Sequence, residues 1–597
     1  MRVGVLIKQV PSVESLALGP DGRLVREGRE LEINAYCRRA ISQGVTLAQQ
    51  TDGTCTVFTL GPPLAEDALR EAVAWGADEG VLITDPAFAG SDTLATARAL
   101  AAAIHLLGPF DLLLVGRNSV DADTGQVGPE VAEMLGLPFL GGVKAMTLSS
   151  DRVIARLELD DGWADAEVDL PALLSCAERL CTPAKVDQPG RDAVDPARLR
   201  RLCAADLGPG PWGQAGSPTV VGGIRALEVA RQRIVLAGPM ADQVDQAVAL
   251  LRDAGALEAA VGGHCHDEGQ VPENAFRGEK VIAVVLEPGR PRLARQLLGA
   301  AARLAHAVNG QVAAVAVSDA GDVDVVGSWG ADHLVTVRAT LGRQELAAED
   351  VAQAVARWAE EVQPWGVLAP GTLWGREVSA RMAARLGLGL TGDAVEVAVD
   401  GGRLLSWKPA FGGQLVAAIT STSAIQMVTV RAGMLPTPRP RSPRPVEVSE
   451  RLVQPAGRVR VLASGQDDDL DELGSADVVV GIGAGVEPGD YRQLDALLGV
   501  LGAELAATRK VTDQGWQPRS RQLGLTGRSL VPRLYVAIGL SGKFNHLVGV
   551  RGAGKILAIN NDRNAKVFAS ADIGIVGDWH QVVPLLAERI GRERYRA

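Results

Sequence analysis

The stretches VGVLI (residues 3–7), CTVFTL (55–60) and DLLLVG (111–116) decide the fold, because each is a short apolar run rich in strand-forming residues. Segments rich in alanine and leucine, with the character of helices, lie between them at 64–75 and 91–107. Strands that alternate with helices predict βαβ units, and therefore a parallel sheet covered by helices on both faces. We expect an α/β protein.

An internal repeat indicates two related α/β domains in one chain. Three features recur in the same order: Trp-Gly-Ala-Asp, an apolar strand that ends in glycine, and a helix that ends in Leu-Gly-Leu. They stand at 75–78, Gly116 and 135–137 in the first copy, and at 329–332, Gly371 and 386–388 in the second. Recurrence of all three in register predicts a duplicated fold.

Two stretches interrupt the alternating pattern. Residues 188–217 are rich in Pro, Gly, Asp and Arg, and residues 435–445 carry proline at nearly every second position, so both are typical of extended connectors. A third α/β unit begins after Val459. The expected domains are 1–217 with its connector, 218–434, a proline-rich linker at 435–458, and 459–597.

The bulk properties exclude several classes of protein. The 597 residues carry a formal net charge of -11 and form no dense Lys/Arg run, so nucleic acid is not an expected partner. No apolar segment is long enough for a membrane span, and the six cysteines are too sparse for a disulfide scaffold, so we expect a cytoplasmic protein. The cluster His264-Cys265-His266 lacks a second ligand group, so no metal site is predicted.

The C-terminal region combines glycine-rich turns with hydroxyl groups. An apolar strand runs into glycines at 479–485, and the segments 524–527 (GLTG) and 539–542 (GLSG) each hold a hydroxyl between glycines. Backbone and hydroxyl groups can therefore approach a large anionic ligand such as a dinucleotide pyrophosphate. Arg509 and His546 flank the region and could place positive charge against a ring that becomes anionic on reduction. Taken as isolated residues, they are equally explained as a surface arginine and a histidine at the end of a helix.

This C-terminal block resembles the FAD domain of the electron transfer flavoprotein alpha subunit. The matching stretches are TRKVTDQGWQP (508–518), QLGLTG (522–527), PRLYVAIGLSGKFNH (532–546), ILAINNDRNAKVF (556–568) and ADIGIVGD (571–578). Their glycines stay in register throughout, which makes the resemblance highly specific.

The rest of the chain resembles the other parts of the same family. The order of motifs at 3–11, 32–34, 61–62, 75–78, 91–93 and 116–128 is similar to that of the beta subunit. Residues 233–432 resemble the first domain of the alpha subunit, including GREVSARMAARLGLGLTGD at 375–393. The resemblance implies a natural fusion, beta before alpha, of two adenine-nucleotide alpha-hydrolase-like parallel-sheet domains and a doubly wound FAD-binding domain.

The resemblance also implies roles for individual residues. Arg509 would lie over the isoalloxazine, Thr526 near flavin N5 and His546 near the C2 carbonyl. The other residues expected to line FAD are Thr508, Gln522, Leu523, Gly524, Leu525, Ser541, Gly542, Lys543, Phe544, Asn545, Asn560, Asp578 and Trp579. Three positions depart from the family pattern: Ala484 replaces an arginine, Leu525 a glutamine and Arg528 a lysine.

A second nucleotide is expected in the N-terminal domain, where the family holds AMP in simple carriers and a second FAD in bifurcating members. We expect AMP. The residues expected to contact it are Leu6, Asn34, Leu60, Gly116, Asp121, Asp123, Thr124, Gly125, Gln126 and Val127. Because carboxylates repel phosphate, Asp121 and Asp123 are expected to cap the following helix or to order the loop.

The resemblance implies an electron carrier rather than an enzyme that converts a small substrate. It would accept electrons from flavoprotein dehydrogenases, such as the acyl-CoA dehydrogenases of fatty acid β-oxidation, and pass them to a quinone reductase or another acceptor. Two alternatives stay open: a bifurcating flavoprotein that uses NADH, and a non-redox adenine nucleotide-binding protein. Residues 177–194 lack the N-x-P-R-Y-like wording that usually precedes the dehydrogenase-anchoring loop, so the partner is expected to be unusual.

Overall fold

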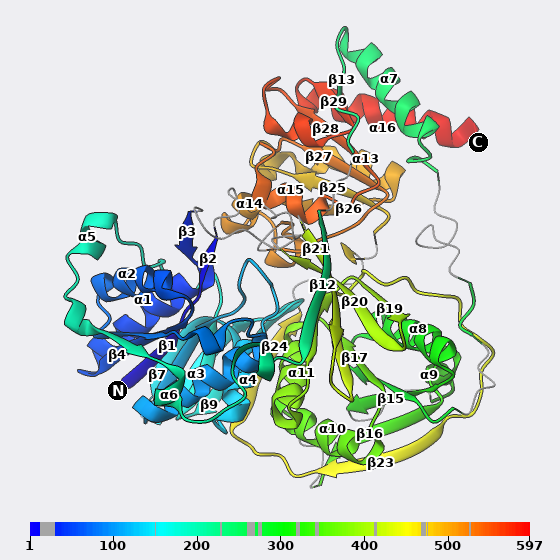
Figure 1. Cartoon of the computed structure of the whole chain (residues 1–597). Coiled ribbons are helices and arrows are strands. Elements are labelled where there is room, and N and C mark those ends of the chain that lie inside the picture. The colour runs from blue at the N-terminus through cyan, green and yellow to red at the C-terminus, as the bar shows by residue number, and fades with distance from the viewer. Residues whose placement is uncertain are drawn as a thin grey trace. The chain divides into compact units, whose positions relative to one another are not determined.

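The computed structural model describes the chain except residues 12–29, 150, 227–229, 259–268, 273–277, 318–322, 341–345, 411–414, 467–472, 475, 525–526 and 597 (Figure 1). Residue contacts divide it into two compact units. The first contains 1–225, 268–411 and 416–465, and the second contains 226–267, 412–415 and 466–597. The cluster at 264–266 lies outside the described residues.

The first unit consists of two lobes whose parallel strands follow the same order. In the first lobe (residues 1–202) the order is β11 (Leu199–Leu202), β5 (Glu79–Ile83), β4 (Thr54–Leu60), β1 (Arg2–Leu6), β6 (Leu112–Gly116), β10 (Ala172–Cys176) and β7 (Phe139–Ser149). In the second lobe (residues 281–453) it is β23 (Glu447–Val453), β16 (His333–Ala339), β15 (Gln311–Val317), β14 (Val281–Leu286), β17 (Gly366–Pro370), β22 (Gln426–Val430) and β18 (Leu390–Ala394). The predicted duplication is therefore confirmed at the level of topology.

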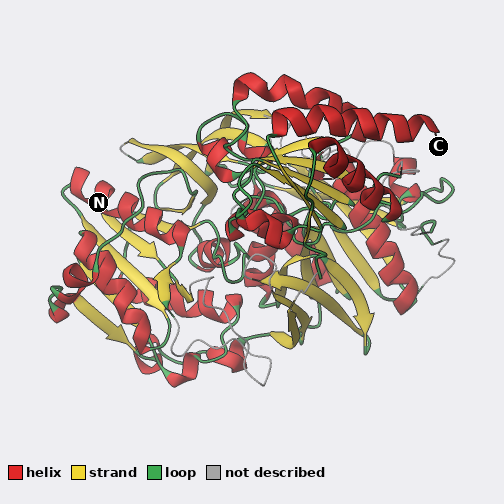
Figure 2. Cartoon of the chain, turned by 90° about the horizontal axis from the view of Figure 1, so that it is seen from above, coloured by secondary structure: helices red, strands yellow, loops and turns green. Residues whose placement is uncertain are grey.

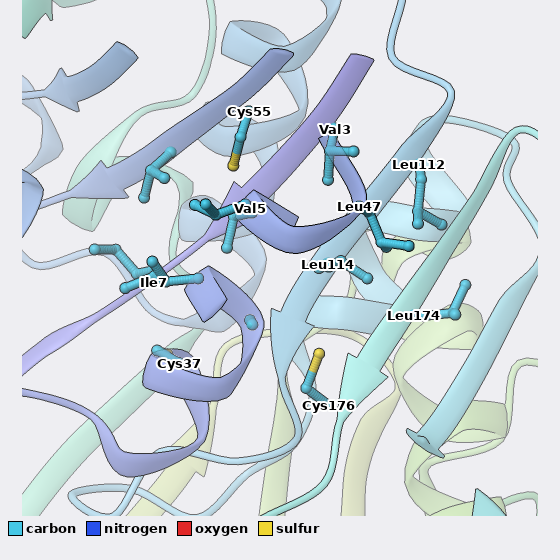
Figure 3. Close-up of a cluster of buried hydrophobic side chains, with 14 of the residues drawn as sticks. Val3, Val5, Ile7, Cys37, Leu47, Cys55, Leu112, Leu114, Leu174 and Cys176 are labelled. Atoms are coloured by element: carbon cyan, nitrogen blue, oxygen red, sulfur yellow. The ribbon is translucent and has the colours of Figure 1, made fainter. Parts of the chain in front are cut away.

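Helices pack against the sheets of both lobes, and Figure 2 shows the helices in red beside the strands in yellow. The first lobe contains α1 (Ala35–Gln50), α2 (Glu66–Trp75), α3 (Thr93–Leu107) and α4 (Val127–Met134), and the second contains α8 (Pro291–Val308), α9 (Val323–Ser328), α10 (Ala348–Val362) and α11 (Leu373–Leu386). Alternate side chains enter the cores on opposite faces: Val3 and Val5 pack in one cluster, and Leu6 in the other. Figure 3 shows Val3 and Val5 beside Leu47 of α1.

The repeated Trp-Gly-Ala-Asp forms the same turn in both lobes. Gly76 and Gly330 have φ of 133° and 124°, values that side chains rarely tolerate. The carboxylates of Asp78 and Asp332 each accept a hydrogen bond of 2.8 Å from a backbone N–H near the start of β4 and of β15, respectively. The glycine and the aspartate recur because the turn requires both.

The two expected connectors contain strands of the sheets. β11 lies within 188–217 and β23 within 435–458, and each is the outer strand of its lobe. The sequences of these two segments resemble connectors because strands at the edge of a sheet tolerate the proline and charged residues that are also typical of connectors. After β11, the strand β12 (Thr219–Ala226) joins the second lobe, and after β23, the strand β24 (Val459–Gln466) joins the first lobe.

These crossing strands pair with antiparallel extensions of the lobes. β12 pairs with β21 (Leu415–Ser421), which continues to β20 (Arg403–Ala410) and β19 (Glu396–Asp400); β24 pairs with β9 (Gly162–Asp169), which continues to β8 (Arg152–Glu158) and β7. Arg460 of β24 binds Glu167 at 2.5 Å and Asp169 at 2.8 Å. The two lobes thus exchange strands.

The second unit is a doubly wound sheet. Its strands follow the order β13 (Ile234–Val235), β29 (Ile573–Val576), β28 (Lys555–Asn560), β27 (Leu534–Ile538), β25 (Val478–Ile482) and β26 (Glu504–Ala507), with parallel pairing throughout. Its helices include α7 (Met240–Asp253), α13 (Asp495–Leu501), α14 (Arg509–Asp513), α15 (Phe544–Leu547) and α16 (Trp579–Arg596).

The second unit takes in a segment from far upstream, so its limits differ from the expected 459–597. Val244 and Leu251 of α7 are fully buried in one core with Leu586 of α16. The Arg231 guanidinium lies 2.8 Å from the Asp572 carboxylate, and both side chains are buried. Residues 231–257 therefore pack as part of this unit rather than of the second lobe.

Among the described residues, no helix has the length and apolar composition needed to cross a membrane.

A buried carboxyl lies where α3 packs against α4. The Thr93 hydroxyl is 3.0 Å from Glu130 Oε1 and 2.9 Å from Gln126 Oε1. One hydroxyl proton cannot serve two acceptors, so a proton on Glu130 completes the set by donating to Thr93. Burial raises the pKa of Glu130 to about 8, which agrees with a neutral carboxylic acid.

We expect Leu251→Ala to destabilise the second unit by about 2 to 5 kcal/mol, because it leaves a cavity between α7 and α16. Denaturant unfolding followed by a probe in this unit measures the loss. Val531→Ala, at a side chain that is 54% exposed, serves as the control and should change stability by less than about 0.5 kcal/mol. An equally small effect of Leu251→Ala would show that α7 does not contribute to the fold of this unit.

We expect Glu130→Gln to remove a pH dependence of stability. Between the ordinary glutamate pKa and the folded-state pKa of about 8, the unfolded chain releases a proton that the folded chain retains, so wild-type stability falls as pH rises. The amide keeps a donor without titrating, so the variant should gain on the wild type from pH 5 to pH 8 in thermal unfolding. The exposed Glu360→Gln should follow the wild type; identical pH profiles for all three proteins would contradict a buried neutral acid.

Candidate functional site

The residues predicted to hold FAD gather at the carboxyl ends of the strands of the second unit. Thr508 follows β26, Ser541 follows β27, Asn560 ends β28, and Asp578 and Trp579 follow β29. The chain moves from β25 to β26 on one side and then to β27 on the other, so the order reverses between β25 and β27. Ligands of doubly wound sheets bind in the crevice at this reversal.

Two glycines let the loops at this edge approach one another. Gly524 has φ of 122°, and a Cβ there would lie 2.1 Å from the carbonyl oxygen of Asn545. A Cβ on Gly542 would lie 2.0 Å from the backbone nitrogen of Val567. A side chain at Gly524 would push this turn away from Asn545, and one at Gly542 would push its loop away from Val567, so both close contacts depend on glycine.

Hydrogen bonds hold the same loops to the strand ends. Leu523 donates its N–H to the Ala507 carbonyl at 3.0 Å, and the buried Gln522 accepts from the Thr512 hydroxyl at 2.7 Å. The Asn560 amide donates to the Leu540 carbonyl at 2.7 Å. Ser541, Lys543 and Asn545 are exposed beside them. The edge is therefore ordered by the protein itself.

Trp579 fixes the start of α16 in the same way, since its indole N–H donates to the Gly485 carbonyl at 3.2 Å. The carboxylate of Asp578 is 2.8 Å from Nδ1 of His580, and the carboxylate of Asp490 is 3.3 Å from Nε2 of the same ring. These contacts raise the pKa of His580.

His546 is buried and neutral. Its Nε2 lies 2.7 Å from the Tyr535 hydroxyl. Burial lowers the pKa of His546 to about 4, and the backbone of Leu523 offsets this shift in part. The charge expected at this position from the sequence is therefore absent at neutral pH. Within the described residues Nδ1 has no hydrogen-bond partner of good geometry, and a buried polar atom left without one is costly.

Arg509 supplies a cation at the start of α14. Its side chain is 45% exposed and lies 3.1 Å from Asp513 one helical turn later. Leu525 and Thr526 lie outside the described residues, and the side chain of Phe544 is likewise not described.

The predicted second nucleotide residues also meet at strand ends, in the first lobe. Leu6 ends β1, Leu60 ends β4 and Gly116 ends β6. The Asn34 side chain donates to the Asn118 carbonyl at 2.7 Å and accepts from the backbone N–H of Val120 at 3.1 Å. Asn34 alone therefore holds the loop that runs from Gly116 to α4 at two points.

Asp121 and Asp123 order this loop and do not cap α4. Lys8 Nζ lies 2.6 Å from the Asp121 carboxylate, and the Asn118 amide donates to Asp123 at 2.5 Å. The N-cap of α4 is Gln126, which makes no side-chain capping bond. The capping alternative is wrong, because loop partners and strand ends already take up both carboxylates.

The second lobe brings cations to the same loop. Lys408 of β20 donates to the Ala122 carbonyl. Arg376 and Arg431 both bind the fully buried Asp393, and Arg431 lies 3.7 Å from Asp123. Burial lowers the pKa of Lys408 to about 8, although Asp393 opposes this shift.

Sequence reasoning missed these second-lobe cations and also Tyr535. Arg376 and Asp393 stood within the quoted stretch at 375–393, but their pairing depends on tertiary structure. Lys408, a charged residue amid an apolar strand, was the one local signal of a buried charge.

Comparison with known proteins agrees with this geometry. The electron transfer flavoprotein domain matches residues 21–202 and 281–455, which are the two lobes. The electron transfer flavoprotein FAD-binding domain matches residues 472–551, in the second unit. The order of these matches follows the order of the structural parts.

Individual relatives match different parts of the chain. The electron transfer flavoprotein subunit beta of Thermoanaerobacterium thermosaccharolyticum is 39% identical over 225 residues, which cover 37% of this chain and 86% of that protein. Subunit alpha from the same organism is 34% identical over 308 residues, covering 50% of this chain and 93% of that protein. The acryloyl-CoA reductase electron transfer subunit gamma of Anaerotignum propionicum is 42% identical over 181 residues, covering 30% and 68%.

The matches to the family domains and to both kinds of subunit cover the two lobes and the second unit. The chain therefore belongs to the electron transfer flavoprotein family, with a beta-like part and an alpha-like part fused in one polypeptide.

Proposed function

We propose that the chain is a single-polypeptide electron carrier that holds one FAD at the carboxyl edge of the second unit. The observation that carries this proposal is the buried Nδ1 of His546, which makes no hydrogen bond of good geometry in the described chain although the backbone of Leu523 lies beside the ring. It lies in a loop that packs closely on Gly524. A ligand with a hydrogen-bond acceptor would satisfy this atom, and the flavin carbonyl groups are such acceptors.

Several residues around this edge would contact FAD. Thr508, Ser541, Gly542, Asn560, Asp578 and Trp579 would line the pyrophosphate, ribityl chain and adenosine of FAD. FAD, when bound, supplies the redox-active ring that takes up and releases electrons. Arg509 would attract negative charge on that ring, because a preorganised cation stabilises charge where it develops.

We further propose an adenine nucleotide at the loop between Gly116 and Val127, with AMP as the ligand. The loop lies at the carboxyl ends of parallel strands, and the second lobe brings Lys408, Arg376 and Arg431 to it beside Asp123 and Asp393. Cations at this edge can contact a phosphate. Because these cations come from the second lobe, a ligand that contacts both them and the loop has to extend from one lobe to the other. A second FAD is therefore the second candidate ligand, and it would imply a bifurcating protein.

The proposed electron donor is a flavoprotein dehydrogenase that acts on acyl-CoA thioesters in the cytoplasm, with a quinone reductase or another redox protein as acceptor. One similar protein is named as an electron transfer subunit of acryloyl-CoA reductase, whose substrate is a CoA thioester.

The segment at 177–194, where the family pattern of the beta subunit is missing, is held to α2 by Arg191. The Arg191 guanidinium lies 2.8 Å from Asp67 and 2.9 Å from Glu71.

Acid release of bound nucleotides from the purified full chain, followed by chromatography, should give one FAD and one AMP per chain. The loops at both edges are held by contacts within the protein, and we expect the ligands to survive purification. Two FAD per chain would replace the AMP proposal with the two-flavin alternative. A chain that stays colourless after incubation with FAD would contradict the electron carrier, and AMP alone would support the non-redox alternative.

Arg509→Ala should make the flavin potential more negative, because it removes a cation that stabilises the reduced ring. Loss of one such interaction costs about 1 to 3 kcal/mol, or roughly 40 to 130 mV for a one-electron couple. Redox titration against dyes measures the shift. Arg509→Lys should retain most of the potential. Arg563→Ala, which removes an exposed arginine beyond β28, is the matched control; equal potentials in the two alanine variants would refute the role of Arg509.

A further inference from the structure

The Tyr535 hydroxyl is enclosed within the second unit. Tyr535 lies in the middle of β27 and is fully buried. Its hydroxyl occupies the space above Gly481 of the neighbouring strand, where a Cβ would lie 1.7 Å from the phenolic oxygen. Burial raises the pKa of Tyr535, so it stays a phenol. In the described part of the chain, this hydroxyl makes its hydrogen bond to His546 Nε2, at 2.7 Å.

That hydrogen bond constrains the proton of the histidine. A phenol has one proton, and we take it as the donor to Nε2, because the reverse direction would leave this buried proton without the acceptor 2.7 Å away. A neutral imidazole that accepts at Nε2 carries its proton on Nδ1. Because burial keeps the ring neutral, with a pKa of about 4, protonation of both nitrogens does not compete at neutral pH.

We propose that Tyr535 is a positioning residue that holds His546 in the tautomer with the proton on Nδ1, so that this nitrogen is a hydrogen-bond donor for the bound flavin. The inference rests on the proposed function for the identity of the acceptor. The tautomer itself is a property of the chain without ligand.

Loss of the hydroxyl has a defined consequence. With phenylalanine at 535, Nε2 loses its donor, and the proton is free to move to that nitrogen. Nδ1 would then present a lone pair to a flavin carbonyl, and two acceptors repel. Tyr535 therefore affects the flavin through His546 rather than by contact.

The test uses the full chain stripped of FAD and labelled with ¹⁵N-histidine. Two-bond ¹H–¹⁵N correlation at pH 7 distinguishes the tautomers, and His546→Gln identifies the signal among the seven histidines. The wild type and the control Tyr491→Phe should show the proton on Nδ1, whereas Tyr535→Phe should show it wholly or partly on Nε2. A wild-type proton on Nε2, or the same tautomer in Tyr535→Phe as in the wild type, overturns the proposal.

FAD affinity supplies the second readout. Tyr535→Phe should weaken FAD binding by about tenfold, which is the loss of one hydrogen bond. In the His546→Gln background the same change should have no further effect, because the tyrosine acts through the histidine. Additive losses would mean that Tyr535 acts independently and would overturn the inference. If the wild type binds no FAD, the proposed function fails, and the tautomer measurement still decides the position of the proton.

Discussion

The exchange of strands β12 and β24 between the two lobes is the constraint on which the rest of the first unit depends. Each lobe completes its parallel sheet with its own outer strand and then gives the next strand to the antiparallel extension of the other lobe. The backbone groups of these strands are satisfied across the lobes, and a typical hydrogen bond contributes about 0.5 to 1.5 kcal/mol. The chain passes into the second unit directly after each exchanged strand. Each of these two connections therefore starts from a strand that is held in a sheet.

Charged side chains between the lobes reinforce this exchange. Arg381 of α11 is 1% exposed and lies 3.1 Å from Glu133 of α4, and its other nitrogen is 3.1 Å from Glu377. Asp160, in the β8–β9 turn of the first lobe, accepts the backbone N–H of Leu373 at the start of α11 at 2.6 Å. A carboxylate at a helix N-terminus is favourable, and removing one partner of a buried pair leaves a charge uncompensated. The lobes are thus specific partners, which places the cations of the second lobe at the loop of the first.

The sequence predicted those features that follow from local periodicity. The strands around Val3 and Leu112 and the duplicated turn at Gly76 and Gly330 agree with the structure. It did not predict β11 and β23, because edge strands tolerate the proline and charge that also mark connectors. Nor did it predict the place of α7, whose amphipathic pattern indicates a buried face but not the partner that covers it.

The state of His546 was misjudged for a related reason, since residue type gives no measure of burial. A buried imidazolium without a counterion is costly, so the buried His546 stays neutral and can offer a directional hydrogen bond but no positive charge. Arg509, by contrast, is 45% exposed and keeps its charge at little cost. Water, however, weakens the field of an exposed cation. A site that must stabilise negative charge on a buried ring therefore needs both kinds of residue. A half-exposed arginine supplies the charge, and a dry neutral histidine, oriented by Tyr535, supplies a hydrogen bond that solvent does not weaken.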